Sequence, residues 1–347
     1  MNDNKTSKNS IVAKFAVPIS FLILFFLAEN FTDCDLVTFW KRRSHLTDLV
    51  VDMIPPDFSY IQKILLPLFY TIQMSVTGTV LGTFFALVLS PFGAANLGFP
   101  AVIRRILRIV IQILRSFPAL ILALTATFLF GLGTFAGTFA ITLYTFAIMT
   151  KLTYEDASAA DVKAYQALRA MGVSKYVAYI HGILPEIIPG FLTNALYLLE
   201  TNVRHSSILG YVGAGGIGLL LNEKISWLEY DKVGTILLML FLTVCVIEYF
   251  SRYLAALIRK ERTIKKEQAR LLLLFLAALF LICTFTLSLP DFSRTSPQTL
   301  RNMFAGFLQP DWSFFFSAEK DGLGYLLLET VCIAFIGTVI GAIVSAP

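Results

Sequence analysis

The sequence predicts an all-α polytopic membrane protein with about eight transmembrane helices. Its 347 residues are 56% hydrophobic and only 15% charged, whereas soluble domains have about 45–50% apolar and about 25% charged residues. Acidic and basic residues are absent from 64–103, 116–150 and 271–290. A membrane helix needs roughly 20 apolar residues, so each stretch can hold at least one span. Composition and charge spacing therefore argue against a water-soluble enzyme.

The predicted spans are bounded by proline, glycine and charged residues, which interrupt the apolar runs. Lys5, Lys8 and Lys14 precede the apolar stretch Phe15–Ala28, as in a signal peptide, but the sequence Ala28-Glu29-Asn30 is not an A-x-A cleavage site. We therefore expect an uncleaved first helix. In chain order, the spans are predicted near 12–29, 64–90, 103–130, 134–151, 183–208, 232–256, 270–289 and 324–346.

The distribution of the 28 Lys and Arg residues indicates the orientation. With a cytoplasmic N-terminus, most of them lie on the cytoplasmic side, including those in 104–108, 151–175 and 252–270. This is the positive-inside pattern of a multi-pass protein. The net charge of +5 then faces anionic lipid of the bilayer, and nucleic acid is not needed as a partner to explain it.

The chain shows no pattern for metal binding or catalysis. Its four cysteines lack C-x-x-C spacing, and none of its three histidines lies within four residues of another. We expect no metal site and no disulfide scaffold. An intramembrane enzyme is a disfavoured alternative, because the helices carry no His/Glu cluster or Ser–Lys pair at a usable spacing. No catalytic residue is predicted.

Two sequence segments occur twice. PDFSY at 56–60 returns as PDWSF at 310–314, and GTVLG at 78–82 returns as GTVIG at 337–341. Tandem duplication of one membrane domain explains both matches, and chance similarity between apolar helices is the alternative. The second copy reaches Pro347 after two helices, so either the chain is a truncated fusion or further helices are missing. The paired glycines fit close helix packing better than a ligand role.

A polar, Ala-rich segment from Tyr154 to Pro185 separates two predicted spans. Its pattern predicts a short helix, a break at Gly172, a second short helix and a membrane helix with Pro185 in its first turn. A loop of about thirty residues with its own helices is usually functional. We call residues 155–182 the elbow and expect it to carry a function on the cytoplasmic side.

The spacing in this segment resembles the E-A-A-x3-G-x9-I-x-L-P signature of ABC importer permeases. Two departures occur: Gln166 stands in place of the usual Glu, and the pair Gly182-Ile183 shifts the Ile by one position. In that family the loop is a coupling helix that docks into a cytoplasmic ATPase. The positions that match the signature are Gln166, Ala167, Leu168, Gly172, Leu184 and Pro185.

This resemblance implies a membrane-spanning permease subunit in a bacterial inner membrane. One six-helix permease unit would be followed by the first two helices of a second copy. The implied domains are 1–62 (first helix and outer loop), 63–258 (permease core with the elbow) and 259–347 (start of the second repeat).

The resemblance also implies the partners. The chain has no P-loop, so ATP and Mg would bind a partner ATPase dimer, and this chain would bind no cofactor. The other expected partners are an extracytoplasmic substrate-binding protein and a second permease copy, as a homodimer or a fused repeat.

Three further stretches are similar to phosphonate-type permeases: RSFP at 115–118, GLGTFAG at 131–137, and NVR at 202–204 followed by LGYVGAGGIG at 209–218. The resemblance covers about residues 55–258. It implies ATP-driven import of phosphonates or related phosphorus oxyanions. Another small solute, such as phosphate, phosphite or an amino acid, is the alternative. Ala119 and Thr134 depart from the acid and the Pro that this branch often carries.

Polar residues inside the predicted helices are candidates for a translocation pathway. Arg115, beside Ser116, is predicted about 15 Å along the membrane helix from its basic end at Arg104 and Arg105. At that depth in the bilayer an Arg is costly unless it faces protein or water. It either lines an anion pathway or bonds nearby carbonyls, which Pro118 leaves accessible. Glu200 and Arg204 are spaced to pair on one helix face. With Asn202 they line a pathway or form a self-neutralising packing cluster.

The sequence GAGGIG at 213–218 matches the G-x-G-x-x-G pattern of dinucleotide sites. Such a site needs a preceding strand and a following helix, whereas a membrane helix precedes this one. We interpret Gly213, Gly215, Gly216 and Gly218 as a tight outer turn. The main rival function is an ion-coupled secondary transporter, which needs buried acids, and only Glu200 and Glu248 are candidates.

Overall fold

Helices and turns make up the described part of the chain, which contains no strand. The computed structural model describes residues 21, 23–32, 36–260, 266–287, 301–302, 305–306, 309, 312–317 and 322–345. Two compact units are distinguished, Val51–Leu300 and a smaller unit of Met1–Val50 with Arg301–Pro347.

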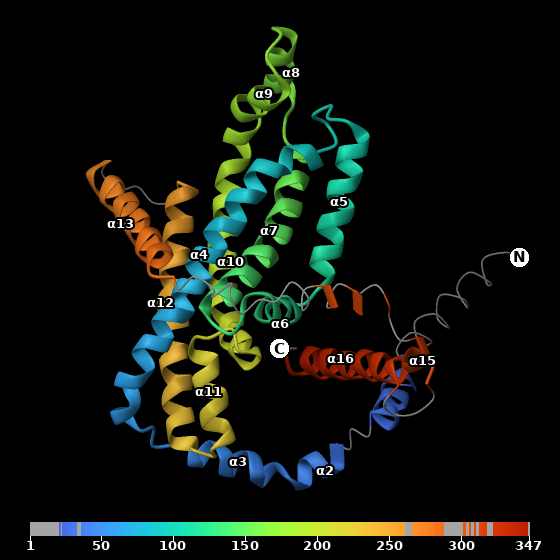
Figure 1. The fold of residues 1–347 in the computed structure, drawn as a ribbon, viewed down its shortest axis with the longest axis vertical. Helices are drawn as coiled ribbons and strands as arrows, with labels where there is room; N and C mark the ends of the chain where they lie inside the picture. The colour runs from blue at the N-terminus through green and yellow to red at the C-terminus, as the bar shows by residue number, and fades with distance from the viewer. Residues whose placement is uncertain are drawn as a thin grey trace, which may run out of the picture. The chain divides into compact units, whose positions relative to one another are not determined.

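The larger unit is a bundle around the long helix α4, with α8 and α9 at one end and α11 at the other (Figure 1). Its helices are η1 (Phe58–Tyr60), α4 (Ile61–Gly93), α5 (Ala101–Ser116), α6 (Ala119–Phe130), α7 (Thr134–Ala159), α8 (Lys163–Ala170), α9 (Lys175–Gly182), α10 (Leu184–Leu209), η2 (Gly210–Val212), α11 (Ile217–Ser226), α12 (Tyr230–Ile258) and α13 (Lys266–Phe285).

The described helices of the smaller unit come from both ends of the chain. They include α2 (Leu36–Lys41), the start of α3 (Arg43–Asp52), α15 (Trp312–Phe315) and α16 (Leu323–Ser345). Residues 23–31 are also helical, and the earlier part of the span predicted at 12–29 lies outside the described residues. The same is true of Pro310 and Asp311 in the second PDWSF segment.

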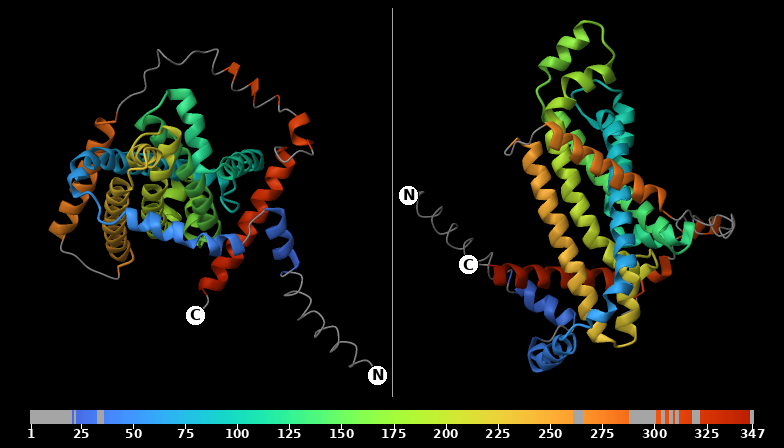
Figure 2. Two further views of the ribbon diagram at one scale, coloured as in Figure 1. Left: turned by 90° about the horizontal axis from the view of Figure 1, so that it is seen from below. Right: turned by 90° about the vertical axis from the view of Figure 1, so that its left-hand side faces the viewer.

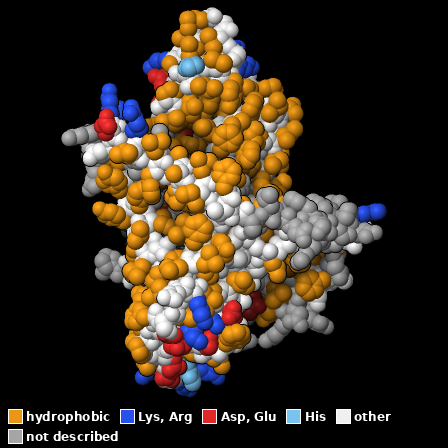
Figure 3. Space-filling view, turned by 60° about the vertical axis from the view of Figure 1, so that its left-hand side comes forward, with side chains coloured by type: hydrophobic (Ala, Val, Ile, Leu, Met, Phe, Trp, Pro, Cys, Tyr) orange, Lys and Arg blue, Asp and Glu red, His pale blue; other side chains and the backbone are white. Residues whose placement is uncertain are grey.

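Within the described residues, four helical segments are long and apolar enough to cross a membrane: Phe58–Gly93, Thr134–Ala159, Tyr230–Ile258 and Leu323–Ser345. Two bent helix pairs, α5 with α6 and α9 with α10, raise the number to six if each counts as one span. Large apolar side chains cover the middle of the face in Figure 3, and charged ones gather towards its ends. The fold is therefore that of an all-helical membrane protein, and the count of eight spans stays a prediction.

The continuous helix predicted over 103–130 is wrong. The structure has two helices there, α5 and α6, bent by 94° at Phe117 and Pro118. Proline has no N–H to donate, and it disfavours helical angles at the preceding residue. Phe117 accordingly adopts extended angles, φ −83° and ψ 124°. The sequence is apolar on both sides of Pro118, so composition alone did not reveal the end of one helix and the start of the next.

The other spans agree with the prediction more closely. Helices α4, α10, α12 and α16 each begin and end within three residues of the predicted positions. Helix α7 runs eight residues past the predicted end at 151, to Ala159. The residues that follow 151 are good helix formers, so the helix continues beyond its apolar part towards the elbow.

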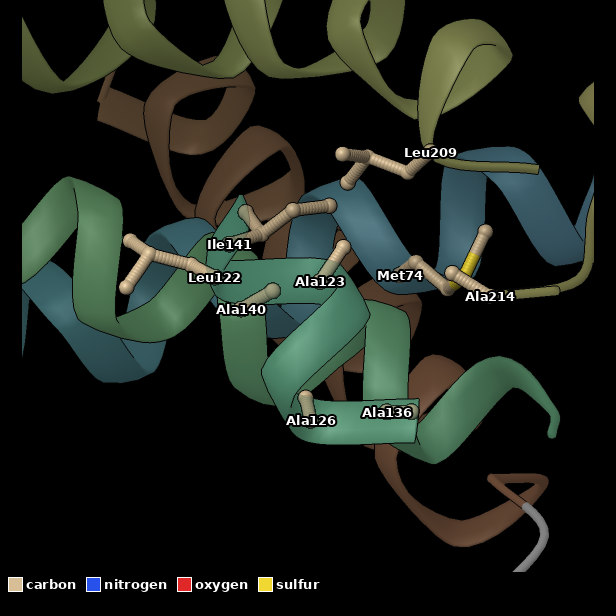
Figure 4. Packing of buried hydrophobic residues seen from close by; sticks show 9 residues of the cluster. All are labelled: Met74, Leu122, Ala123, Ala126, Ala136, Ala140, Ile141, Leu209 and Ala214. Carbon is tan, nitrogen blue, oxygen red and sulfur yellow. The ribbon is translucent and has the colours of Figure 1, made fainter. Parts of the chain in front are cut away.

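The centre of the bundle is packed through small residues (Figure 4). Helix α4 approaches α7 so closely that a Cβ on Gly78 would lie 2.7 Å from Ile141, and one on Gly82 would lie 2.7 Å from the Thr142 carbonyl oxygen. Small residues permit such approach in lipid, where dispersion replaces the hydrophobic effect as the driving force. The buried cluster beside this contact is Met74, Leu122, Ala123, Ala126, Ala136, Ala140, Ile141, Leu209 and Ala214.

Helix α13 packs across α4 at an oblique angle in the larger unit (Figure 2). The buried Gln73 side chain of α4 donates to the Cys283 carbonyl oxygen at 3.0 Å and to the Thr286 hydroxyl at 2.8 Å. In the smaller unit, residues 23–31 pack on α16. The rings of Phe31 and Tyr325 lie 4.8 Å apart, and the Tyr325 hydroxyl donates to the Phe31 carbonyl at 3.4 Å.

Candidate functional site

The elbow has the predicted shape of two short helices separated by a glycine break. Gly172 lies between α8 and α9 with a φ of +87°, a conformation that residues with a Cβ rarely adopt. The Arg169 side chain donates to the Val173 carbonyl across this turn. Ser174 caps α9 by accepting a hydrogen bond from the Val177 N–H at 3.4 Å. Local sequence therefore determines the shape of the elbow.

The predicted coupling residues lie on two parts of this structure. Gln166 and Ala167 are exposed on α8, and Leu168 is half-buried. Met171, at the tip next to Gly172, is 71% exposed. Leu184 and Pro185 begin α10, where the missing N–H of proline costs nothing. The tip thus presents an exposed surface, while Leu184 and Pro185 connect it to the membrane helix.

Two tyrosines attach the elbow to the bundle. The buried Tyr165 hydroxyl donates to the Leu97 carbonyl oxygen at 2.6 Å, and the Tyr179 hydroxyl lies 3.4 Å from that of Ser90 near the end of α4. Burial raises the pKa of Tyr165, so its hydroxyl remains protonated and able to donate. Sequence reasoning missed both tyrosines, because their contacts with Leu97 and Ser90 form only when the elbow packs on the bundle.

Backbone packing strengthens this attachment. A Cβ on Gly182, at the end of α9, would lie 2.8 Å from the backbone nitrogen of Tyr165. The two short helices therefore pack directly backbone against backbone. They share a buried cluster with the α4–α5 loop and the start of α10: Ala94, Leu97, Ala157, Tyr165, Ala178, Tyr179, Ile183 and Ile187.

Charged side chains form an alternating chain along α10 and α12. Arg204 pairs with Glu200, as their spacing predicts. Arg204 also faces Glu248 of α12, with 4.0 Å between Nη2 and Oε2. Glu248 in turn pairs with Arg252 through Oε1. The sequence identified only the pair within α10, because Arg204 and Glu248 meet only when the two helices pack.

Asn202 lies on another face of α10. It is fully buried, and its Nδ2 donates to the hydroxyls of Thr79 and Thr145, each at 2.8 Å. The residue thus joins α10 to α4 and α7. Nearby, the hydroxyls of Ser75 and Ser206 lie 3.1 Å apart. These contacts favour a packing role for Asn202, and contact with a substrate stays a prediction.

Arg115 and Ser116 end α5 at the bend, and both are exposed. The Ser116 hydroxyl donates to the Ile113 carbonyl at 2.7 Å. Arg115 lies close enough to Tyr144 of α7 for an electrostatic interaction. The Tyr144 ring lies 5.6 Å from that of His205, the neighbour of Arg204. Sequence reasoning missed this contact between Tyr144 of α7 and His205 of α10.

The Gly-rich segment is a tight turn before α11. Gly213, Gly215 and Gly216 have φ values from +72° to +81°. The Ile217 N–H donates to the Thr71 hydroxyl at 2.8 Å, and a Cβ on Gly218 would lie 1.9 Å from the Ser207 carbonyl oxygen. The turn is filled by the chain's own backbone, which supports a structural role.

A compact ionic cluster lies at the opposite end of the unit from the elbow. The buried Lys224 contacts Glu223 at 3.0 Å and Glu229 at 2.9 Å, and it lies 4.2 Å from the centre of the Trp227 ring. Burial alone would lower the pKa of Lys224, but hydrogen bonds to Glu229 and Glu223 outweigh it and raise the pKa. Hydrogen bonds from Lys232 and Lys224 lower the pKa of Glu229. This cluster fixes the turn between α11 and α12.

Comparison with known proteins decides the family. Residues 78–263 match the binding-protein-dependent transport system inner membrane components. The chain belongs to this family. It is therefore the permease component of an ABC importer, a multi-pass membrane protein that works with an ATPase and a substrate-binding protein. The identification made from the elbow motif is confirmed.

Relatives within the family transport phosphorus compounds, according to their names. The phosphite transport system permease protein PtxC of Stutzerimonas stutzeri is 31% identical over 217 residues, 62% of this chain and 79% of PtxC. The phosphate-import permease protein PhnE of Mycolicibacterium smegmatis is 31% identical over 203 residues, 58% of this chain and 38% of PhnE.

The fold is also found in a solved structure. The MetNI methionine ABC transporter in an inward-facing conformation superimposes with a TM-score of 0.52 and 20% identity, over 58% of this chain and 99% of that one. At this identity the likeness shows only the fold of the permease. The expected permease fold is confirmed.

Proposed function

We propose that this permease imports phosphorus oxyanions such as phosphite, phosphonate or phosphate. The observation that carries the proposal is Arg204, a side chain 50% exposed on a membrane helix. An arginine there is costly unless it faces water or a charged partner. Its planar guanidinium matches the geometry of phosphorus oxyanions. The names of the relatives favour the same substrate class.

The pathway runs along the side of α10 that carries Glu200 and Arg204. Arg115 and Ser116 at the end of α5 belong to it as well, since Arg115 acts electrostatically on Tyr144, whose ring contacts His205 beside Arg204. Asn202 holds α10 against α4 and α7 behind this surface. The outer turn, Gly213–Gly218, contributes backbone rather than side chains.

The elbow couples the pathway to ATP. A dimeric partner ATPase binds ATP and Mg and contacts the exposed tip with Gln166, Ala167 and Leu168, and this chain itself binds no cofactor. Tyr165 and Tyr179 link the elbow to the α4–α5 loop and to the end of α4. Movement of the ATPase is thereby transmitted to α4 and α10, and the pore alternates between inward and outward access.

The chain contains parts of two permease copies, divided as 1–62, 63–258 and 259–347. The two PDxSx segments both give a short helix before a long one, η1 before α4 and α15 before α16. Helix α13, which begins the second copy, packs on α4, and residues 23–31 of the first copy pack on α16. Each first helix thus contacts the second helix of the other copy, which supports a pore built from two fused halves.

The repeat-related glycines differ in their surroundings. Gly78 and Gly82 of α4 are covered by α7, whereas no atom of the described residues lies within 4 Å of a Cβ added to Gly337 or Gly341. With a cytoplasmic N-terminus in a bacterial inner membrane, the two copies together give about eight spans in this chain.

Growth of a strain lacking its own importers tests the substrate. Cells receive this permease with its ATPase and binding protein and are grown on phosphite, methylphosphonate or phosphate as the sole phosphorus source. We expect growth on at least one of them, and loss of growth with Arg204→Gln. Methionine uptake in the same cells is the comparison. Methionine import without any phosphorus import would refute the proposed substrate class.

A further inference from the structure

Glu248 of α12 is a carboxylate with an arginine on each side. It lies between two arginines, with Oε2 towards Arg204 and Oε1 paired with Arg252. It is ten residues from the end of α12 at Ile258, which corresponds to about 15 Å along the helix. A carboxylate at that depth is expensive to bury and indicates a functional site.

The two arginines have unequal contacts with this carboxylate. Arg252 hydrogen bonds to Glu248, but the 4.0 Å between Arg204 and Glu248 is too long for a hydrogen bond. Among the described residues, Arg204 donates only through Nη2, to Glu200. A guanidinium has five N–H donors. Arg204 therefore retains N–H donors that no described residue accepts.

The arginines of this group are more exposed than the carboxylates. Arg204 is 50% exposed and Arg252 is 78% exposed, whereas Glu248 is 29% and Glu200 is 13% exposed. The carboxylates are thus the more enclosed members, and the guanidinium groups face outward. An anion that approaches along α10 and α12 meets the arginines before it meets the acids.

We infer that Glu248 is a resident counter-ion, which holds between Arg204 and Arg252 the place that the transported oxyanion takes. The inference rests on the proposed function for its substrate class. An oxyanion with three oxygens can accept from both guanidinium groups, whereas Glu248 accepts from Arg252 and only faces Arg204. When the anion enters, Glu248 is displaced, and its return then repels the anion and speeds release.

This role has a thermodynamic consequence. Glu248 and the oxyanion compete for the same donors, so the carboxylate weakens anion binding by a coupling factor, and such factors are typically about 5–150-fold. Weak binding suits a transport pathway, because a tightly held anion leaves slowly. Glu248 therefore sets the residence time of the anion in the pathway.

The test measures equilibrium binding of radiolabelled inorganic phosphate to the full chain with its ATPase in nanodiscs, without binding protein. Glu248→Gln, which removes the charge and keeps the shape, should tighten binding at least about fivefold. Glu248→Asp, which keeps the charge, should bind like the wild type. The double variant Glu248→Gln/Arg252→Gln should lose this increase in phosphate affinity, because the second guanidinium is removed.

Glu229→Gln is the matched control, because Glu229 also lies between two cations, Lys224 and Lys232, at the other end of α12. It should leave phosphate affinity unchanged. The inference is overturned if Glu248→Gln does not tighten binding, if Glu248→Asp or Glu229→Gln tightens it equally, or if Arg252→Gln has no effect. If Glu248→Gln does not assemble with the ATPase, phosphate binding by the single variant Arg252→Gln tests the inference. This variant should bind phosphate about fivefold more weakly than the wild type.

The same assay with sulfate separates this inference from the proposed function. If Glu248→Gln tightens sulfate binding and the cells import no phosphorus compound, the counter-ion role stands and the substrate class is wrong. If cells import phosphite or phosphonate and Glu248→Gln binds phosphate no better than the wild type, the substrate class stands and the counter-ion role is wrong.

Discussion

The hydroxyl of Tyr165 in α8 donates a 2.6 Å hydrogen bond to the carbonyl oxygen of Leu97 in the α4–α5 loop. Both residues are almost fully buried, so the bond is shielded from water. It joins the segment that contacts the ATPase in the proposed mechanism to the loop that ends α4. A push on the elbow is therefore transmitted to the membrane helices through a polar contact as well as through packing.

Replacement of Tyr165 by Phe tests this link. The change removes one oxygen and leaves the Leu97 carbonyl without its donor, at a cost of about 1–3 kcal/mol. We expect a lower unfolding temperature and less substrate imported per ATP hydrolysed. The measurements are thermal unfolding in detergent and transport with ATPase activity in proteoliposomes. Tyr176→Phe, on the neighbouring α9, is the control, and an equal effect there would contradict a specific role for Tyr165.

Substitution of Gly172 tests the shape of the elbow. At a φ of +87°, a residue with a Cβ costs about 1–2 kcal/mol, and the turn between α8 and α9 is expected to shift. Gly172→Arg should reduce co-purification of the ATPase and abolish uptake without preventing membrane insertion. Gly190→Ala is the control, because Gly190 is helical and has open space around it. Intact co-purification and uptake in Gly172→Arg would refute the coupling role.

Packing between α4 and α7 predicts a difference between repeat-related glycines. A methyl group on Gly82 would meet the Thr142 carbonyl oxygen at 2.7 Å, and overpacking of this kind costs about 1–3 kcal/mol. We expect Gly82→Ala to lower the unfolding temperature of the 347-residue chain and Gly341→Ala to leave it almost unchanged. Similar losses at both positions would show that α16 is covered as α4 is.

The outer ionic cluster predicts a dependence of stability on pH. The pKa of Glu229 is lowered from its usual 4.5 by hydrogen bonds from Lys232 and Lys224. Because the pKa of Glu229 is lower in the folded protein than in the unfolded chain, its carboxylate stabilises the fold at pH values above the unfolded-chain pKa. This stabilisation is lost as the pH falls through the pKa of the folded protein. Glu229→Gln should therefore lower the unfolding temperature at pH 7, and the difference should shrink as the pH falls below the usual Glu pKa of 4.5.

The control for this experiment is Glu267→Gln, in the exposed first turn of α13. Surface charges of this kind contribute little to stability, so its unfolding temperature should follow that of the wild type at every pH. A loss in Glu229→Gln that persists unchanged at acidic pH would show that the cluster stabilises through packing instead.

The sequence by itself determined where most helices lie. Lipid provides no hydrogen-bond partners, so a spanning segment must be a continuous apolar helix, and its limits are visible as charges, glycines and prolines. The elbow could be predicted for a related reason. Glycine readily adopts the left-handed conformation needed at the turn, and proline fits the first turn of a helix, so Gly172 and Pro185 indicate a helix break and a helix start from local sequence alone. The same local evidence failed at Pro118, where an apolar sequence continued across a 94° bend.

Only the tertiary structure decided which polar residues meet. Arg204 and Glu248 are separated by α11 and much of α12 in the chain, and they face each other because α10 packs on α12. Asn202 lies two residues from Arg204, yet it is buried among threonines of two other helices. The rotation of each helix about its own axis decides which side chains its polar residues meet. This rotation depends on how all the neighbouring helices pack together. Local periodicity identifies a polar residue in a membrane helix, but the partners of that residue come from the fold.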